Sequence, residues 1–379
     1  MAAAPVHRLP GERLEEQPTA GIALCLSGGG YRAMLFHLGA LWRLNELAYL
    51  QRLDRISSVS GGSITAGFLG SRWNELDFDE AGVSRRFEEV VVGPVRALAG
   101  STIDLWAILR GLLGPGSIGS AIASAYARRG LGSATLQELP DRPRFVFNAT
   151  NLQSGVLWRF SKPYMRDYRV GEVKLPREQI AVAVAASSAF PPFLSPIVLE
   201  LPESAYSPKG EEDLHFPPFT TRPTLSDGGV YDNLGLETAW KGNRTLLVSD
   251  GGGRFSRKER PRRLWPLQLL HVLNVIDSQV RSLRKRQLID GYDAGIRDGA
   301  YWGIWTDLGN YGLGDALPAP HAQTLVLART KTRLKRVPAT RQERLINWGY
   351  AVCDAAMRAH VDDSLPPPPG FPYPGAGIG

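Results

Sequence analysis

Apolar runs that suit buried strands alternate along the chain with stretches of helical periodicity. GIALCLS at 21–27 is a strand candidate, and YRAMLFHLGALWRLNEL at 31–47 repeats apolar residues at helical spacing. RISSVS at 55–60 and the glycine-led segment 61–73 repeat this succession. Further strands are predicted at 145–152 and 244–250. The alternation predicts an α/β fold with a mainly parallel central sheet flanked by helices.

Three later stretches have patterns of their own. Segment 266–288 places five apolar residues on one stripe of a predicted helix: Leu269, Leu273, Ile276, Val280 and Leu283. Segment 101–127 is apolar and punctuated by glycine, which favours a buried core helix over a lid or a lipid-facing surface. The tail PPPPGFPYPGAGIG at 366–379 is expected to be extended or disordered and to add no element to the core.

The composition is that of an ordinary globular protein. Hydrophobic residues make up 43% and charged residues 21% of the 379 residues. Two cysteines, Cys25 and Cys353, offer no disulfide framework, and no apolar stretch approaches the roughly 20 residues of a membrane-spanning helix. The N-terminus is charged and lacks the apolar run of a signal peptide. We therefore expect a soluble, cytoplasmic protein.

A net charge of +7 favours anionic partners, either nucleic acid or anionic lipid headgroups. Basic residues concentrate locally at 256–265 and 281–287, but neither run is interleaved with aromatic residues or set in a nucleic-acid-binding motif. Solvated helix faces are the expected role of both runs. Nucleic acid is therefore not an expected partner.

The first chemical motif is the glycine-rich segment LSGGGYRA at 26–33, which directly follows the first predicted strand. Consecutive glycines at the start of a helix allow several backbone N–H groups to point at one anion, either a phosphate or the oxyanion of an acyl-transfer intermediate. The segment lacks the Gly-Lys-Ser/Thr of a nucleotide-binding P-loop, and Ala33 breaks the G-x-G-x-x-G pattern. A purely structural turn remains an alternative.

The second motif, SSVSGGSITAG at 57–67, again leads from a strand to a helix. Ser60 stands where a nucleophile elbow would place its serine, before two glycines, although Ser58 replaces the usual preceding glycine. Ser63 is a rival hydroxyl, but Thr65 stands where its following glycine should be. A serine that merely caps the helix is the structural alternative. Because the motif lies one βαβ crossover after the glycine loop, we expect both at one edge of the sheet.

The base that would activate Ser60 is less evident. Of the six histidines, His321 is the loop candidate in the chain order of an α/β-hydrolase triad, and its surroundings give it no further support. A carboxylate is the better candidate, and two nearly repeated motifs offer one each. Asp227 lies in LSDGGVYDN and Asp250 in VSDGGGRFS. No spacing of His, Cys, Asp or Glu suggests a metal site, and no cofactor is expected.

The order of these motifs resembles that of the patatin-like phospholipases. SGGGYRA, the elbow at Ser60, AVAASSAFPPFLSP at 183–196 and SDGGVYDNLG at 226–235 carry the resemblance over residues 20–250, and the first is most similar to the cytosolic phospholipase A branch. LINWGYAVCDAAMR at 345–358 resembles the C-terminal helix of bacterial members. The resemblance implies a three-layer α/β fold, a Ser-Asp dyad without histidine, and hydrolysis of lipid acyl esters at a membrane surface, with the protein bound peripherally.

The resemblance also assigns roles to individual residues. Ser60 would be the nucleophile and Asp227 its base. Gly28, Gly29 and Gly30 would form the oxyanion hole, with Gly28 shaping the turn and the other two donating N–H groups. Arg32 would contact a substrate phosphate, or else form a structural ion pair. Residues 190–193 would shape the wall of the site, although packing alone would explain them.

Four parts of the chain are expected on this basis. They are an N-terminal extension at 1–19, the catalytic core at 20–250, a C-terminal helical and strand portion at 251–362 packed on the same domain, and the tail at 363–379. The alternative function is that of a non-catalytic protein that uses the glycine loop to bind an anion or a lipid headgroup. The presence of both a serine and an acid favours the enzyme.

Overall fold

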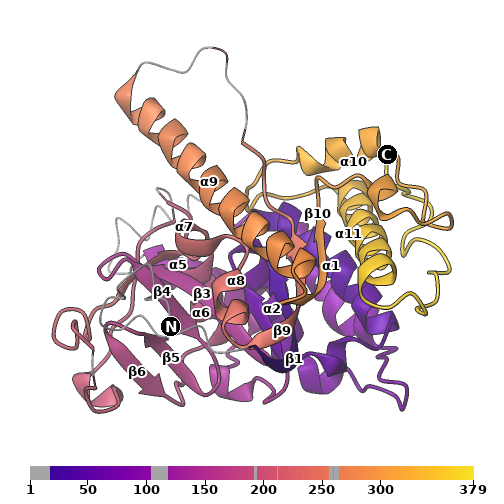
Figure 1. The fold of residues 1–379 in the computed structure, drawn as a ribbon. Helices are drawn as coiled ribbons and strands as arrows, with labels where there is room; N and C mark the ends of the chain where they lie inside the picture. Colours follow the sequence, from indigo (N-terminus) through magenta and orange to yellow (C-terminus); the bar gives the residue numbers. More distant parts are fainter. Residues whose placement is uncertain (1–17, 104–117, 192–193, 211, 256–258, 260–263) are drawn as a thin grey trace, which may run out of the picture.

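A ten-stranded sheet forms the centre of the molecule (Figure 1). The structure, a computed structural model, describes residues 18–103, 118–191, 194–210, 212–255, 259 and 264–379. The strands are β1 Thr19–Leu26, β2 Arg55–Ser58, β3 Arg144–Asn151, β4 Val156–Phe160, β5 Tyr164–Asp167, β6 Gly171–Lys174, β7 Ile197–Val198, β8 Thr224–Asp227, β9 Asn243–Asp250 and β10 Asp298–Gly303.

The strands of the sheet follow the order β10-β9-β1-β2-β3-β4-β5-β6. From β10 to β3, neighbouring strands are parallel, whereas β3 to β6 form an antiparallel meander. The short strands β7 and β8 pair with each other, and β8 also pairs with β3. The predicted α/β fold with a mainly parallel sheet is therefore confirmed.

Helices cover both faces of the parallel part of the sheet. They are α1 Gly30–Glu46, α2 Gly61–Ser71, α3 Gly93–Ala99, α5 Ile118–Tyr126, α6 Ile180–Ser187, α7 Gly229–Asp232, α8 Leu236–Trp240, α9 Trp265–Asp293, α10 His321–Ala328 and α11 Ala339–His360. Central β1 shows the layering, because Leu24 and Leu26 join the large core under α1, α2 and α11 while Ala23 and Cys25 join a smaller core with α8. A strand buried on both faces reads as the continuous apolar run seen in the sequence.

The helices α1 and α11 cross at close range through two glycines. A Cβ atom at Gly39 would lie 1.9 Å from the carbonyl oxygen of Ile346, and one at Gly349 would lie 1.9 Å from that of Phe36. Side chains at either position would therefore push the helices apart. This crossing holds the C-terminal helix against the helix that begins at the glycine loop.

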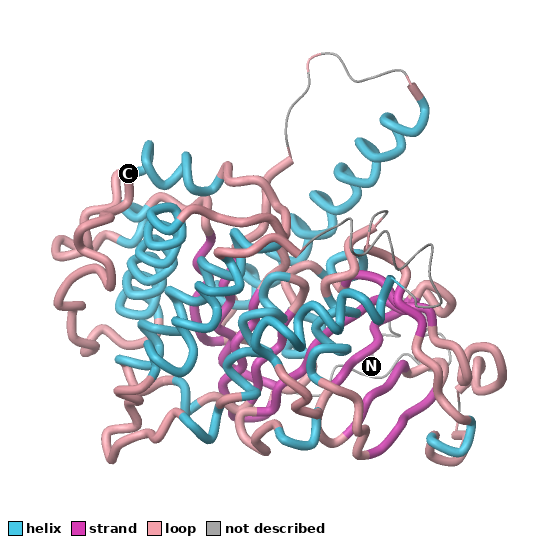
Figure 2. The backbone as a smooth tube through the Cα atoms, turned by 180° about the vertical axis from the view of Figure 1, so that it is seen from behind, coloured by secondary structure: helices cyan, strands magenta, loops and turns pink. Residues whose placement is uncertain are grey.

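The helix α9 departs from what its sequence suggests. An apolar stripe ordinarily faces a core, but Leu269, Leu273, Ile276 and Leu283 are 48% to 56% exposed. The N-terminal half of α9 stands away from the body of the protein, as both backbone views show (Figures 1 and 2). Every helix in the described ranges is too short or too polar to span a bilayer.

The Pro/Gly-rich tail also differs from expectation. It contains no helix or strand, as predicted, but it packs against α1 and α11 instead of staying apart. The Asn347 amide donates to the carbonyl oxygens of Tyr373 and Gly377, both at 2.8 Å, and Ile378 is 3% exposed. In the apolar segment 101–127, residues 104–117 lie outside the described residues, while α5, which follows them, is partly buried.

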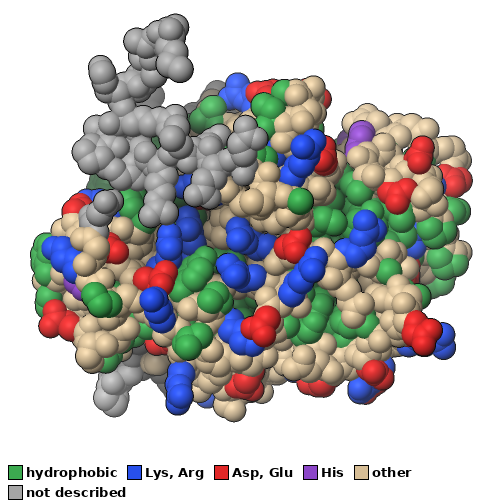
Figure 3. Space-filling view, turned by 60° about the horizontal axis from the view of Figure 1, so that its bottom comes forward, with side chains coloured by type: hydrophobic (Ala, Val, Ile, Leu, Met, Phe, Trp, Pro, Cys, Tyr) green, Lys and Arg blue, Asp and Glu red, His purple; other side chains and the backbone are tan. Residues whose placement is uncertain are grey.

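Basic side chains do not gather in one stripe on the face shown in Figure 3, where acidic and apolar side chains separate them. Part of the 281–287 run is half-buried, since Arg281 pairs with Asp250 and Arg284 with Glu237. Most of the 256–265 run lies outside the described residues.

Candidate active site

Ser60 occupies a sharp turn between β2 and α2. Its backbone has φ 51° and ψ −116°, a conformation that is costly for a residue with a side chain and is typical of a nucleophile elbow. The turn is possible because glycines follow: a Cβ at Gly61 would lie 2.3 Å from the carbonyl oxygen of Gly30. The Ser60 amide donates to the Ser187 hydroxyl at 3.1 Å, which fixes the turn from the side of α6.

Asp227 reaches Ser60 through an arrangement of strands that periodicity alone does not reveal. β2 runs parallel to β3, with Ser58 opposite Phe147. β8 runs antiparallel to β3 on the same edge, since β4 occupies the other one, and Asp227 lies opposite Ala149. The two strands thus approach each other end to end along β3, and their last residues face positions about 7 Å apart.

Burial dominates the electrostatics of Asp227, which is 2% exposed. Burial raises the pKa of its carboxyl from 3.8 to about 7, although hydrogen bonds from the Gly229 amide and the Ser60 hydroxyl act in the opposite direction. The Gly229 amide donates to Oδ1 at 2.7 Å. Oδ2 is buried without a fully formed hydrogen bond in the described part of the chain, so it is available to a proton from Ser60.

The glycine loop lies directly against Ser60. A Cβ at Gly28 would lie 3.2 Å from the Cβ of Ser60. The Gly28 amide donates to the carbonyl oxygen of Asn233 at 3.0 Å, so it is not available to an oxyanion. In the described ranges, the amides of Gly29 and Gly30 have no acceptor. Two free N–H groups at the start of α1 therefore lie beside the elbow.

The rival serine is unsuited to nucleophilic attack. Ser63 is fully buried, and its hydroxyl bonds to the hydroxyls of Ser58 at 3.0 Å and Ser187 at 2.8 Å. Ser58, the departure from the usual glycine, donates in turn to the carbonyl oxygen of Val146. These bonds accommodate the extra hydroxyl beneath the elbow.

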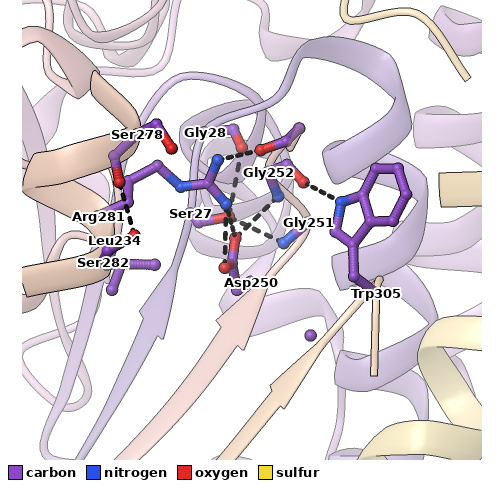
Figure 4. Close-up of polar contacts among 12 residues, drawn as sticks. Ser27, Gly28, Leu234, Asp250, Gly251, Gly252, Ser278, Arg281, Ser282 and Trp305 are labelled. Atoms are coloured by element: carbon purple, nitrogen blue, oxygen red, sulfur yellow. Dashed lines mark hydrogen bonds and ion pairs between the residues drawn. The ribbon is translucent and has the colours of Figure 1, made fainter. Parts of the chain in front are cut away.

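Asp250 is occupied by an ion pair, as the close-up shows (Figure 4). Arg281 lies 3.1 Å from its carboxylate, Tyr301 donates at 2.8 Å, and the Gly252 amide donates at 2.9 Å. Burial opposes its ionisation, but Arg281 and these hydrogen bonds outweigh burial and lower the pKa to about 2. A carboxylate held so firmly in its ionised form is a poor base.

Arg32 is held by backbone carbonyl groups. Its guanidinium donates to the carbonyl oxygens of Gly251 at 3.1 Å and Thr330 at 2.6 Å, and the side chain is 3% exposed. Among the described residues, no carboxylate lies within ion-pair distance of this guanidinium, and Asp250 acts on it only at longer range. Its Nη2 atom is buried and has no acceptor among the described residues, next to Gly29. A contact with a substrate phosphate stays a prediction.

The described histidines lie elsewhere. His321 lines a pocket that also contains Asp250, and His37 is buried between Ser249 and Ser27. None of the recorded histidine contacts in the described part of the chain involves Ser60 or Asp227. The same residues contain no group of three or more His, Cys, Asp or Glu side chains that could hold a metal ion.

Sequence reasoning missed the residues that support the site from behind. Asn148 donates to Ser57 at 2.9 Å and to the carbonyl oxygen of Ser58 at 3.0 Å, so it links β3 to the base of the elbow. Ser187 donates to the Asn148 carbonyl oxygen. Asp232 accepts from the amides of Leu234 and Glu237 and fixes the start of α8. A buried asparagine in FVFNATNL was the available signal for Asn148.

Comparison with known families identifies this arrangement. The family model described as patatin-like phospholipase matches residues 24–240, which include the glycine loop, the elbow at Ser60 and the motif of Asp227. The chain belongs to the patatin-like phospholipase family. No curated protein matches the chain.

Among solved structures, human GIVD cytosolic phospholipase A2 in complex with methyl gamma-linolenyl fluorophosphonate is similar with a TM-score of 0.50 and 15% identity, covering 91% of this chain and 58% of that one. Another structure of the human enzyme has a TM-score of 0.39 and 13% identity, covering 64% and 49%. VipD from Legionella pneumophila has a TM-score of 0.35 and 15% identity, covering 90% and 67%. The chain thus spans about half to two thirds of the length of these three structures.

Proposed function

We propose that this patatin-like protein is a lipid acyl hydrolase of the phospholipase A or lysophospholipase type. Ser60 is the nucleophile, Asp227 the base, and Gly29 and Gly30 the oxyanion hole. The observation that carries the proposal is the buried Asp227 carboxyl beside the Ser60 elbow, with its pKa raised by burial to about 7. A base with a pKa near the working pH exchanges protons efficiently.

The reaction would proceed through an acyl-enzyme. Asp227 accepts the proton of the Ser60 hydroxyl while Oγ attacks the ester carbonyl, and the Gly29 and Gly30 amides stabilise the negative charge on the oxygen. The proton then passes from Asp227 to the departing alcohol. In the second half, Asp227 takes a proton from a water molecule that attacks the acyl-enzyme, and Ser60 leaves with that proton as the fatty acid is released.

A serine-reactive fluorophosphonate tests the assignment. Wild-type protein should be labelled, and both Ser60→Ala and Asp227→Asn should lose labelling and ester hydrolysis by at least about a hundredfold. Ser63→Ala is the matched control, because it removes a neighbouring hydroxyl from the same helix and should remain labelled. Thermal unfolding would verify that each variant is folded.

The competing function is that of a non-catalytic anion or lipid-headgroup binder. Folded wild-type protein that resists labelling and does not hydrolyse mixed phospholipid vesicles would favour it over the enzyme. Labelling that persists in Ser60→Ala but disappears in Ser63→Ala would move the nucleophile to Ser63. Loss of activity in His321→Ala would point to a triad instead of a dyad.

A further inference from the structure

The N-terminal half of α9, which projects from the body of the protein (Figure 1), presents an exposed apolar face. Five of its side chains are 45% to 72% exposed: Trp265, Leu269, Val272, Leu273 and Ile276. At 100° per residue they fall within one sector of about 100° of the helix. We call these five side chains the apolar arm.

Charge is distributed unevenly along this helix. From Leu264 to Ile276 the sequence contains no Asp, Glu, Lys or Arg, whereas RSLRKR at 281–286 is basic. Lys285 and Arg286 have no acidic partner within 4.0 Å in the described ranges, and neither does nearby Arg254. Lys285 and Arg254 instead lie over the rings of Tyr301 and Trp305. An uncharged apolar end that carries a tryptophan, followed by cations without an acidic partner among the described residues, is complementary to a bilayer with anionic headgroups.

The second half of α9 is firmly attached to the protein. Arg284 pairs with Glu237 at 2.7 Å, Tyr292 donates to the carbonyl oxygen of Leu246 at 2.5 Å, and Leu288 is fully buried. The arm is therefore an extension of an anchored helix. A surface that binds the arm would also hold the body of the protein in place.

The same helix borders the candidate active site. It packs against α7, which follows Asp227 directly, and Asp277 is near enough to act on the Asp227 carboxyl electrostatically. On α7, Val230 is also exposed, at 49%. The arm therefore begins beside the dyad and leads away from it.

We propose that the apolar arm inserts into the surface of an anionic phospholipid bilayer and thereby brings the Ser60 site to its substrate. The delivery of Ser60 to its substrate rests on the proposed function. The binding of the arm to a bilayer does not. The five arm side chains enter the interfacial region, and Arg254, Lys285 and Arg286 contact headgroup phosphates.

A second copy of the chain is the less favourable occupant. Helix pairing through such a stripe normally uses opposite charges beside it to set register and orientation, and the stretch from Leu264 to Ile276 has none. Each copy also carries a net charge of +7, with basic residues following the same stretch, so two arms side by side would repel.

Vesicle co-sedimentation tests the proposal with a matched pair of substitutions. Ile276 and Ile296 are exposed to a similar degree, 53% and 57%, but Ile296 follows the anchored end of the helix, about 25 Å further along its axis. All binding is measured in a Ser60→Ala background, so that vesicles remain intact. Ile276→Gln should weaken binding to phosphatidylglycerol-containing vesicles roughly tenfold, and Ile296→Gln should leave it unchanged.

Two further readouts separate the possible failures. Binding should be stronger to phosphatidylglycerol-containing vesicles than to phosphatidylcholine vesicles and should weaken with salt. In the active protein, Ile276→Gln should reduce hydrolysis of vesicles but not of a soluble short-chain ester. Binding through the arm without any hydrolysis by wild-type protein would reject the proposed function and keep the arm.

Three results would overturn the inference. The first is equal binding by Ile276→Gln and Ile296→Gln in folded protein. The second is binding that does not depend on lipid charge, which would exclude an anionic bilayer as the specific partner of the arm. The third is a wild-type dimer in light scattering that Ile276→Gln converts to a monomer, which would assign the arm to a second copy.

Discussion

At the scale of single residues, two aspartates with nearly the same neighbours in sequence have pKa values that are shifted in opposite directions. Both end a strand and both precede glycines, yet burial raises the pKa of Asp227 to about 7, while Arg281, Tyr301 and the Gly252 amide outweigh burial and lower that of Asp250 to about 2. The difference lies in the partners that the fold supplies. Of the two carboxyl groups, that of Asp227 therefore has the pKa suited to proton exchange near neutral pH.

The first consequence is a pH dependence of catalysis. In the proposed mechanism Asp227 must be ionised to accept the proton of Ser60, so kcat/KM for a soluble ester should rise with pH and level off above an apparent pKa of about 7. A stopped assay in constant ionic strength buffers from pH 5 to pH 9 would measure it. A profile that is flat down to pH 5 would mean that Asp227 is not the titrating base.

The second consequence concerns stability. Replacement by asparagine should change the free energy of unfolding in opposite directions at Asp227 and Asp250. Asp227 binds its proton more tightly when folded, so its contribution is complete below about pH 4 and is lost as pH rises toward 7. Asp227→Asn removes that loss and should raise the free energy of unfolding at pH 8 by up to roughly 4 kcal/mol.

Asp250→Asn is the contrasting variant. Its carboxylate stabilises the fold above about pH 4, and that contribution is lost as pH falls toward 2. Replacement leaves Arg281 without its ion-pair partner and should cost roughly 3 kcal/mol at pH 8. Urea denaturation of both variants at pH 8 would compare them, and a destabilised Asp227→Asn would contradict the assigned cause of its pKa.

At the scale of elements, the crossing of α1 and α11 links the C-terminal helix to the glycine loop. Gly349→Ala should destabilise the protein by at least about 2 kcal/mol, because the added Cβ would lie 1.9 Å from the carbonyl oxygen of Phe36. Gly314→Ala is the control, since a Cβ there meets nothing within 4 Å. Equal unfolding midpoints for the two variants would show that the helices can separate at no cost.

Elements with strong local signals could be predicted from the sequence. β1, α1, β2, α2, β3 and β9 begin and end within a few residues of their predicted bounds, because buried runs and glycine turns mark them. The end-to-end approach of β2 and β8 could not be predicted, because β8 is four residues long and its pairing with β3 is set by tertiary structure. Periodicity located the apolar stripe of α9 but contains no information about what covers it.

At the scale of the whole molecule, the C-terminal tail closes the end of the core near α1 and α11. Tyr373 stacks edge-on against Trp42 with ring centroids 5.9 Å apart, and Arg43 donates to the carbonyl oxygen of Pro366. A Pro/Gly-rich composition rules out regular elements but does not prevent burial. The tail forms no core element, as expected, yet its side chains pack against the core.

Removal of residues 369–379 should lower the free energy of unfolding by roughly 3 kcal/mol or more. It deletes the Tyr373 ring and the buried Ile378 and leaves the Asn347 amide without the carbonyl oxygens of Tyr373 and Gly377. Gly375→Ala, where a Cβ meets nothing within 4 Å, should be neutral. A truncated protein with an unchanged urea midpoint would show that the tail merely rests on the surface.

Because β2 and β8 approach each other end to end along β3, the proposed Ser60-Asp227 dyad would depend on the length of β3. Each residue added to a strand shifts its partner by about 3.4 Å and turns the next side chain to the opposite face. One residue inserted at Asn148, between the position opposite Ser58 and the one opposite Asp227, would separate serine from acid while leaving both motifs intact. A folded insertion variant should therefore fail to react with a fluorophosphonate, so a search for the two motifs alone would misclassify it as an active hydrolase.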